Sequence, residues 1–331
     1  MDIKRVKLVV LAVLCAFTFA GCKKNVGAEE DNPVNTEQES DEEKVTYKFG
    51  FSCIAKENPY YVTLADSIRD SLKEEGHTVI GMNKDTHLSS QEQIEQINEM
   101  IEQGIDAIFL SPVDWKEITP ALQALREADV KIINIDTKVA DSDYIDAYIG
   151  SDNKNAGTVC GKDLIEKCEK GGKIVILESP TMSSVNERIT GFEEAIAGSP
   201  FEVVARKDVK GDLTLAMEET KKILKKNPDV VAIMCGNDPS AIGAHVAANE
   251  LGIKGIKIHG VDGSPELKKE LEKPNTLIAG TAAQSPINLG KLAVKTAVNM
   301  LNGEDYEEET YLDTYLITKE NVEMYGTDGW Q

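Results

Sequence analysis

The sequence predicts an α/β fold made of two similar doubly wound parallel-sheet domains, joined by a hinge that the chain crosses three times. Two observations favour this fold class. From Lys44 onward, apolar runs of five to eight residues alternate with helical periods of 12–18 residues. In addition, GIDAIFLSPVDW (104–115) and VKIINIDT (130–137) are echoed about 126 residues later by PDVVAIMCGNDP (228–239) and IKIHGVDG (256–263). A repeated unit of this kind indicates two domains built alike.

Strands are expected where short apolar runs end in small or polar residues, and helices where apolar residues recur every three to four positions. In 90–103, for example, Ile94, Ile97 and Ile101 form an amphipathic stripe that Gly104 ends. The predicted strands are 46–53, 78–82, 105–110, 130–136, 145–149, 173–178, 201–207, 230–235, 256–262 and 277–282. The predicted helices are 60–75, 90–103, 115–128, 154–169, 184–197, 212–226, 239–251, 265–272 and 286–302.

At 331 residues the chain is long enough for two domains of ordinary size. We expect it to cross between them near Gly150-Ser151, near Gln284 and near Asp313. The predicted lobes are therefore an N-terminal lobe of 45–150 plus 284–312 and a C-terminal lobe of 151–283 plus 313–331. Two lobes on a hinge, with their strand ends facing each other, form a cleft that can close.

The N-terminus has the pattern of a signal peptide, which we place at 1–21. Three basic residues precede an apolar run from Leu8 to Ala20, which is too short for a comfortable transmembrane helix. The small residues before Cys22 resemble the lipobox of bacterial lipoproteins, in which that cysteine is lipidated. An ordinary cleaved signal with a chance cysteine is the alternative. Residues 22–44, which hold eight Asp or Glu after the cysteine, are expected to form an acidic disordered tether.

Charge and cysteine usage exclude several classes of protein. A formal net charge of −21 at pH 7 argues against a nucleic-acid surface. Beyond the signal peptide and Cys22, four cysteines are scattered without a C-x-x-C pair, and their spacing does not suit a zinc site. We interpret them as buried small apolar residues, and we expect neither a metal nor a cofactor.

Polar and aromatic side chains stand at the expected carboxyl ends of strands in both halves, where open α/β sheets bind their ligands. The candidate ligand-binding residues are Asn58, Tyr60, Tyr61, Ser111, Asp136, Thr137, Arg188, Asn237, Asp262 and Gln284. The carboxylates accept hydroxyl hydrogens, the guanidinium only donates, the amides do both, and the tyrosines offer flat apolar faces. Such a set suits a neutral ring that bears several hydroxyl groups.

Each candidate taken alone also has a purely structural interpretation. Ser111 and Asn237 stand where helix N-caps are common, the two tyrosines suit a core or surface position, and both aspartates suit turns. A binding site is favoured by the joint pattern, because polar residues fall at strand ends in both halves of the repeat.

From about Val45 to Lys319 the chain resembles the type I periplasmic sugar-binding proteins, the ribose- and galactose-binding group. The matching motifs are Asn58-Pro59-Tyr60-Tyr61, QGIDAIFLSP, INID (133–136), IGSDN (149–153), ERITGF (187–192), GND (236–238), GVDGSP (260–265) and AAQSP around Gln284. The resemblance implies that the sugar cleft is lined by Asn58, Tyr60, Tyr61, Asp136, Arg188, Asn237, Asp262 and Gln284. Ser111 matches a position where ribose binders often carry Asn.

Two departures from the ribose-type pattern point away from ribose itself. Thr137 stands where these proteins commonly have Arg, so we expect a larger pocket or a different hydroxyl pattern. The segment near Gly211 lacks the aromatic residue that ribose binders share. The calcium loop of galactose-type members is also missing, since no D-x-D-x-D-G run occurs, and no metal is implied.

The resemblance implies a monomeric lipoprotein, anchored at the outer face of the cytoplasmic membrane or in the periplasm. It would capture a monosaccharide or polyol and deliver it to an ABC permease. The alternative is a sensor of a sugar or furanose-like signal that acts on a membrane receptor or chemoreceptor. An enzyme is not expected, because the sequence has no G-x-S-x-G motif and no P-loop, and none of its four histidines is paired with a nucleophile pattern. A DNA-binding repressor is excluded, because a signal segment replaces the DNA-binding helices.

Overall fold

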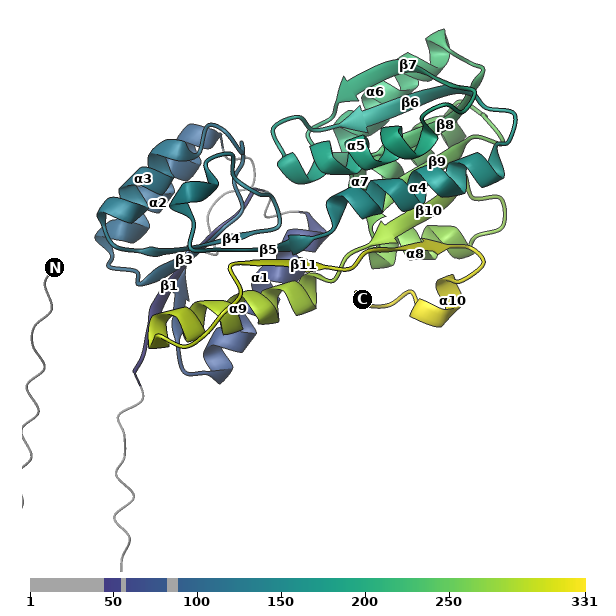
Figure 1. Cartoon of the computed structure of the whole chain (residues 1–331). Helices are drawn as coiled ribbons and strands as arrows, with labels where there is room; N and C mark the ends of the chain where they lie inside the picture. The colour runs from purple at the N-terminus through teal and green to yellow at the C-terminus, as the bar shows by residue number, and fades with distance from the viewer. Residues whose placement is uncertain (1–44, 55–57, 82–88) are drawn as a thin grey trace, which may run out of the picture. The chain divides into compact units, whose positions relative to one another are not determined.

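Strands and helices alternate along the chain in the computed structural model, which describes residues 45–54, 58–81 and 89–331 (Figure 1). The predicted signal peptide, Cys22 and the acidic tether lie outside the described residues. Residues 45–331 form one unit by their contacts, so the two lobes within it are described together.

The first sheet has six parallel strands in the order β11-β5-β4-β3-β1-β2. Its strands are β1 (Lys48–Ser52), β2 (Thr78–Ile80), β3 (Ala107–Leu110), β4 (Lys131–Ile135), β5 (Ala147–Ser151) and β11 (Glu309–Leu312). One face packs against α1 (Pro59–Glu74) and α9 (Pro286–Asn302), and the other against α2 (Ser90–Glu102) and α3 (Thr119–Glu127). This sheet and its four helices are the first lobe.

The second sheet repeats this strand order as β12-β10-β9-β8-β6-β7. Its strands are β6 (Gly172–Glu178), β7 (Phe201–Asp208), β8 (Val230–Cys235), β9 (Lys257–Asp262), β10 (Ile278–Ala283) and β12 (Tyr315–Thr318). One face packs against α4 (Asn153–Lys167) and α5 (Ser183–Ile196). The other face packs against α6 (Leu213–Lys226), α7 (Asp238–Glu250) and α8 (Pro265–Glu272). This sheet and its helices are the second lobe.

The structure confirms the predicted fold class, with one correction to the second sheet. The chain passes to the second sheet between β5 and α4, returns between β10 and α9, and passes again between β11 and β12. However, β12 runs antiparallel to β10, so the second sheet is mixed rather than wholly parallel. The reversal follows from the short β11–β12 connection, because that segment enters the second sheet from its carboxyl edge. The exact lobe boundaries stay a prediction.

All ten predicted strands and all nine predicted helices correspond to elements of the structure. The central strands were predictable because both of their faces are covered, as the fully buried AIFL of β3 illustrates. Four elements were not predicted: η1 (Ser142–Tyr144), β11, β12 and α10 (Val322–Tyr325). Each is at most four residues long, which is too short to show a period.

The helix starts fix the strand-end loops on which the candidate site lies. Asn58 caps α1 by accepting a hydrogen bond from the Tyr60 backbone N–H at 3.0 Å, and Pro59 occupies the first turn. Asn237 caps α7 in the same way. Within the described ranges, no helix is long and apolar enough to cross a bilayer, and no cluster of three or more metal-ligating side chains occurs.

Candidate functional site

Asp136 directly follows β4 and is held by hydroxyl groups of the first lobe. Its carboxylate Oδ2 accepts hydrogen bonds from the Tyr61 hydroxyl at 2.6 Å and from the Thr137 hydroxyl at 3.0 Å. The Tyr148 hydroxyl donates to the Asp136 backbone carbonyl at 2.8 Å. The residue has a φ of 59°, a left-handed conformation that aspartate tolerates better than most side chains. Asp136 is thus a buried acceptor whose backbone is fixed by a turn.

Tyr60 and Tyr61 lie in the first turn of α1 and are both almost fully buried. Their rings meet edge to face, with centroids 5.3 Å apart. Burial raises the pKa of both hydroxyls well above the ordinary value, and the negative charge of Asp136 adds to the rise. Both groups are therefore protonated at neutral pH and available as hydrogen-bond donors. The buried Tyr60 hydroxyl has no partner among the described residues.

Arg188 comes from the second turn of α5 in the second lobe and is 3% exposed. Its Nε donates to the Asn153 side-chain oxygen at 2.8 Å, and its Nη1 donates to the Gly236 carbonyl at 2.9 Å. Nη1 also lies 3.7 Å from Asp262 Oδ1, which is an ion pair longer than a direct hydrogen bond. Two neutral acceptors therefore fix the guanidinium, and its charge faces a carboxylate.

Asp262 is the last residue of β9, the position in the second sheet that corresponds to the end of β4. Its Oδ1 accepts from the Gln284 side-chain amide at 2.8 Å, and its Oδ2 lies 3.4 Å from the Asp238 backbone N–H. The Gln284 side-chain oxygen has no partner among the described residues. At this strand end, Asp262 Oδ1 already accepts a hydrogen bond, whereas the Gln284 side-chain oxygen beside it accepts none from the described residues.

A second buried carboxylate, Asp238, lies close to Asp262. Its two oxygens accept from the Thr281 hydroxyl and the Ser264 backbone N–H, both at 2.7 Å. Burial raises the pKa of Asp262 well above its ordinary value, the charge of Asp238 raises it further, and Arg188 opposes the rise. Burial likewise raises the pKa of Asp238, to about 6. Hydrogen-bond donors from a ligand would favour the charged form of Asp262.

Asn237 fits both of the interpretations that the sequence left open. Its side-chain oxygen accepts from the Ser240 backbone N–H at 3.0 Å, as an N-cap does. Its amide nitrogen donates to the Gly211 carbonyl at 3.0 Å, and the residue also lines a cavity between the two lobes. Gly211 has a φ of 67°, and a Cβ there would stand 2.7 Å from the Asn237 amide nitrogen. Glycine thus allows the loop before α6 to approach this strand end closely.

Ser111 and Thr137 are fully buried and differ in how their hydroxyls are used. The Ser111 hydroxyl has no partner among the described residues. The Thr137 hydroxyl lies 2.8 Å from that of Ser184 in the second lobe. Thr137 is therefore part of a contact between lobes as well as a neighbour of Asp136. Nearby, the Ser183 hydroxyl donates to the Lys138 carbonyl at 2.6 Å and strengthens this contact.

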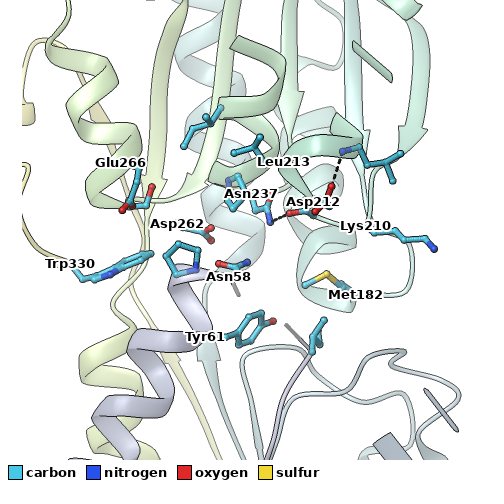
Figure 2. Close-up of a pocket in the computed structure, with 17 residues that line it drawn as sticks. Asn58, Tyr61, Met182, Lys210, Asp212, Leu213, Asn237, Asp262, Glu266 and Trp330 are labelled. Carbon is cyan, nitrogen blue, oxygen red and sulfur yellow. Dashed lines mark hydrogen bonds between the residues drawn. The ribbon is translucent and has the colours of Figure 1, made fainter. Parts of the chain in front are cut away.

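A cavity of about 630 Å³ lies between the two lobes (Figure 2). Four of the ten candidate residues line it: Asn58, Tyr61, Asn237 and Asp262. The other six are buried and do not line it. Tyr61 bonds Asp136, which Thr137 also bonds, and Asp262 bonds Gln284. The volume falls within the range of about 300–1,000 Å³ that is usual for small-molecule sites.

Three candidate residues and Asn153 each carry a buried polar atom without a partner among the described residues. They are Tyr60 Oη, Ser111 Oγ, Asn153 Nδ2 and Gln284 Oε1. Leaving such a group without a partner costs about 1–3 kcal/mol, so these atoms call for an explanation. A ligand that both donates and accepts hydrogen bonds would satisfy them.

The sequence reasoning missed several residues of this region, and three of them illustrate why. Asn153 holds Arg188, Ser184 bonds to Thr137, and Trp330 lines the cavity. Asn153 could have been predicted as a site residue, because it is a polar residue two positions after the end of β5 in the IGSDN motif. No local pattern identifies Ser184 or Trp330, since their roles depend on contacts with distant segments.

Comparisons with known proteins identify the family and the fold. Residues 49–305 match the model of the periplasmic binding protein domain family. The ribose import binding protein of Bacillus subtilis (strain 168) is 29% identical over 266 residues, which cover 80% of this chain and 85% of the relative. The D-ribose/D-allose-binding protein of Pseudomonas aeruginosa is 26% identical over 264 residues, covering 76% of this chain and 81% of the relative.

Solved structures agree as well. An ABC transporter solute-binding protein from Mycobacterium smegmatis with bound glycerol has a TM-score of 0.80 and 27% identity, over 85% of this chain and 96% of that one. One from Actinobacillus succinogenes with bound D-allose has a TM-score of 0.75 and 25% identity, over 85% and 99%.

A two-lobed α/β fold with a cavity between its lobes defines the solute-binding class of protein. The chain belongs to the periplasmic binding protein domain family, as the match over 49–305 shows. The resemblance to type I periplasmic sugar-binding proteins is thereby confirmed. These relatives are solute-binding proteins rather than enzymes, in agreement with the prediction of a binding protein from the sequence.

Proposed function

We propose that this protein captures a sugar or polyol in the cavity between its lobes and delivers it to an ABC permease. The observation that carries the proposal is the set of buried charges at the two strand ends. Asp136 stands on the first lobe, while Arg188 and Asp262 stand 3.7 Å apart on the second. Asn153 and Gln284, which bond the second-lobe pair, carry unpaired polar atoms. The relatives that bind ribose and allose support a sugar as the ligand.

The residue chemistry suits polyhydroxylated ligands better than charged ones. The two carboxylates accept hydroxyl hydrogens, and Arg188 and Tyr60 donate to hydroxyl oxygens. Because one cation offsets part of the buried negative charge, a neutral ligand adds no further charge to the closed site. Charge-assisted hydrogen bonds are roughly twice as strong as neutral ones, so these groups should dominate affinity.

Closure of the lobes would follow from tighter ligand binding in the closed form. The Thr137–Ser184 and Ser183–Lys138 contacts supply part of the interface that closure completes. Once both lobes contact the sugar, ligand release requires their separation. A permease that recognises the closed form would thus receive loaded protein only.

We also propose the cellular setting from the sequence pattern of the N-terminus. Residues 1–21 would be cleaved, Cys22 would carry the lipid, and 23–44 would tether a monomeric domain to the outer face of the membrane. Mass spectrometry of the mature N-terminal peptide tests this directly. A diacylated Cys22 supports the anchor, and an unmodified cysteine or an N-terminus elsewhere contradicts it.

Calorimetry with purified protein tests the binding function. The panel should contain free pentoses, hexoses and myo-inositol, because relatives or similar structures are known with several of these. We expect at least one of them to bind with a Kd in the micromolar range or tighter, and to raise Tm. At 100 times its Kd, such a ligand adds about 2.7 kcal/mol to the free energy of unfolding. If none of these compounds binds, the proposed function is wrong.

A further inference from the structure

The last residues of the chain bring a tryptophan to the cavity. Trp330 lines it together with Asn58, Pro59, Asp262 and Glu266, and Figure 2 shows its ring at one side of the cavity. Two aromatic side chains line the described part of the cavity, Tyr61 and Trp330. Tyr61 already uses its hydroxyl on Asp136. The indole of Trp330 is the larger apolar surface of the two.

The segment that carries Trp330 is fastened at several points. The Lys268 ammonium, on the fully buried side chain of that residue in α8, donates to the Gly329 carbonyl at 2.6 Å. The Ser285 hydroxyl donates to the Gln331 carbonyl, and the Gln331 side chain donates to the Tyr325 carbonyl at 3.0 Å. Burying an ammonium group away from water costs free energy, and the hydrogen bond to the Gly329 carbonyl offsets part of that cost. These hydrogen bonds hold the residues on both sides of Trp330 in place.

Trp330 also touches the aromatic pair at the start of α1. Its ring centroid lies 6.0 Å from that of Tyr60, with the planes at 73°, an edge-to-face contact. Tyr60 is 2% exposed and its hydroxyl has no partner among the described residues, so the neighbouring group offers an unused donor. The segment thus ties α8 of the second lobe to α1 of the first. The indole therefore lies beside Tyr60, whose hydroxyl is one of the unpaired polar atoms.

We propose that Trp330 is a specificity-determining residue, whose indole covers an apolar C–H face of the sugar held by Asp262 and Asn58. This inference rests on the proposed sugar-binding function. The tryptophan lies beyond residues 49–305, the part of the chain that matches the family model. A sugar ring presents hydroxyls at its rim and C–H groups on its faces. An aromatic wall beside carboxylate and amide groups matches both surfaces.

The chain contains two tryptophans, Trp115 and Trp330, which gives a direct optical test. Intrinsic fluorescence is titrated with the tightest-binding sugar of the calorimetric panel in wild type, W115F and W330F. We expect the ligand-induced spectral change to persist in W115F, where Trp330 alone reports, and to be smaller in W330F, where only the interlobe Trp115 reports. Trp115 does not line the cavity, but its backbone N–H donates to the Thr181 carbonyl of the other lobe at 3.1 Å, so its indole reports the contact between the lobes and serves as the comparison.

Affinity provides the second readout. W330A should weaken binding of the same sugar about tenfold by calorimetry, W330F much less, and W115F not measurably. Circular dichroism and Tm establish that each variant is folded, and W330F remains informative if W330A is not. Equal affinity of W330A and wild type overturns the inference, as does a spectral change that is lost in W115F. In those cases the sugar still binds, so the proposed function stands. Absence of binding to wild type contradicts both.

Discussion

Asp136 and Asp262 occupy matching places in the two lobes and lie in different surroundings. Each stands where the fourth strand of its sheet ends, β4 in the first lobe and β9 in the second. Asp136 accepts from two neutral hydroxyls of its own lobe. Asp262 lies beside Arg188, Gln284 and a second buried carboxylate, Asp238. The repeated backbone therefore places Asp136 among neutral hydroxyl groups and Asp262 beside charged side chains.

The difference suggests separate tasks for the two lobes. In the second lobe, Arg188 and Asp262 form a charged pair that a ligand can join on either side. In the first lobe, the carboxylate is already hydrogen-bonded, and aromatic rings surround it. We expect the second lobe to supply most of the electrostatic affinity, and the first lobe to complete the site on closure. The following predictions test this asymmetry, from the largest expected effect to the smallest.

Arg188→Ala should abolish measurable sugar binding while the domain remains folded. Loss of the guanidinium removes the site's cationic donor and leaves Asp262 without its opposite charge, and such changes cost about 2–5 kcal/mol in affinity. Calorimetry measures the affinity and circular dichroism the fold. Arg126→Ala is the matched control, because this partly exposed arginine pairs with Asp146 just before β5, at the opposite end of the strand from the site. A Kd within threefold of wild type for Arg188→Ala would contradict the assignment.

Asp262→Asn should weaken binding more than Asp136→Asn does. The first change removes the partner of Arg188, for which we expect a loss of about 100-fold, or 2.7 kcal/mol. The second change keeps a side-chain oxygen that the Tyr61 hydroxyl can bond, so a loss of about tenfold is expected. Parallel titrations of both variants give the ratio. Equal losses in the two variants would remove the asymmetry between the lobes.

The free energy of unfolding of the ligand-free protein should fall as pH rises from about 4 to about 6 on account of Asp238. Burial raises the pKa of this carboxyl from 3.8 to about 6, so in that window the folded state holds a proton that the unfolded state has released. Stability from a raised pKa is present at low pH and is lost as pH passes the folded value, here by about 2 kcal/mol.

Denaturant unfolding at several pH values measures this effect, with Asp238→Asn as the comparison. The asparagine variant has no titrating group at this position, so its stability should depend less steeply on pH and should gain on that of the wild type as pH rises. An identical pH slope in both proteins shows that Asp238 is not the group responsible.

Thr137→Val should have the smallest effect, a loss of about 0.5–1.5 kcal/mol in the free energy of the closed form. The change removes the hydroxyl contact with Ser184 across the lobes and one of the two hydroxyl donors to Asp136. Small-angle scattering with and without sugar should show a larger open fraction in the variant. If affinity falls more than in Asp136→Asn, Thr137 contacts the ligand directly and does not act mainly through closure.

The strands, the helices and the strand-end position of the site were predictable because they depend on local patterns. Apolar runs mark strands covered on both faces, and the carboxyl ends of parallel strands share one edge. The exposed β11, whose residues alternate between exposed and half-buried, gave no such signal. Nor did the antiparallel β12, whose direction is set by the crossing from the first sheet.

The connections within the site were not predictable, because they join segments far apart in the sequence. Thr137 bonds Ser184 across 47 residues, and Lys268 bonds the carbonyl of Gly329 across 61. The interpretation of Asn237 also needed the structure, which shows that one side chain serves as an N-cap and as a cavity wall. Spacing alone treats these two roles as alternatives.

The crystal structure of the complex with the tightest-binding sugar tests the central claim most directly. We predict one sugar ring in the cavity, with its hydroxyls within hydrogen-bond distance of Asp136 on the first lobe and of both Arg188 and Asp262 on the second. A sugar that contacts only one lobe, or that lies away from these three side chains, would contradict the account.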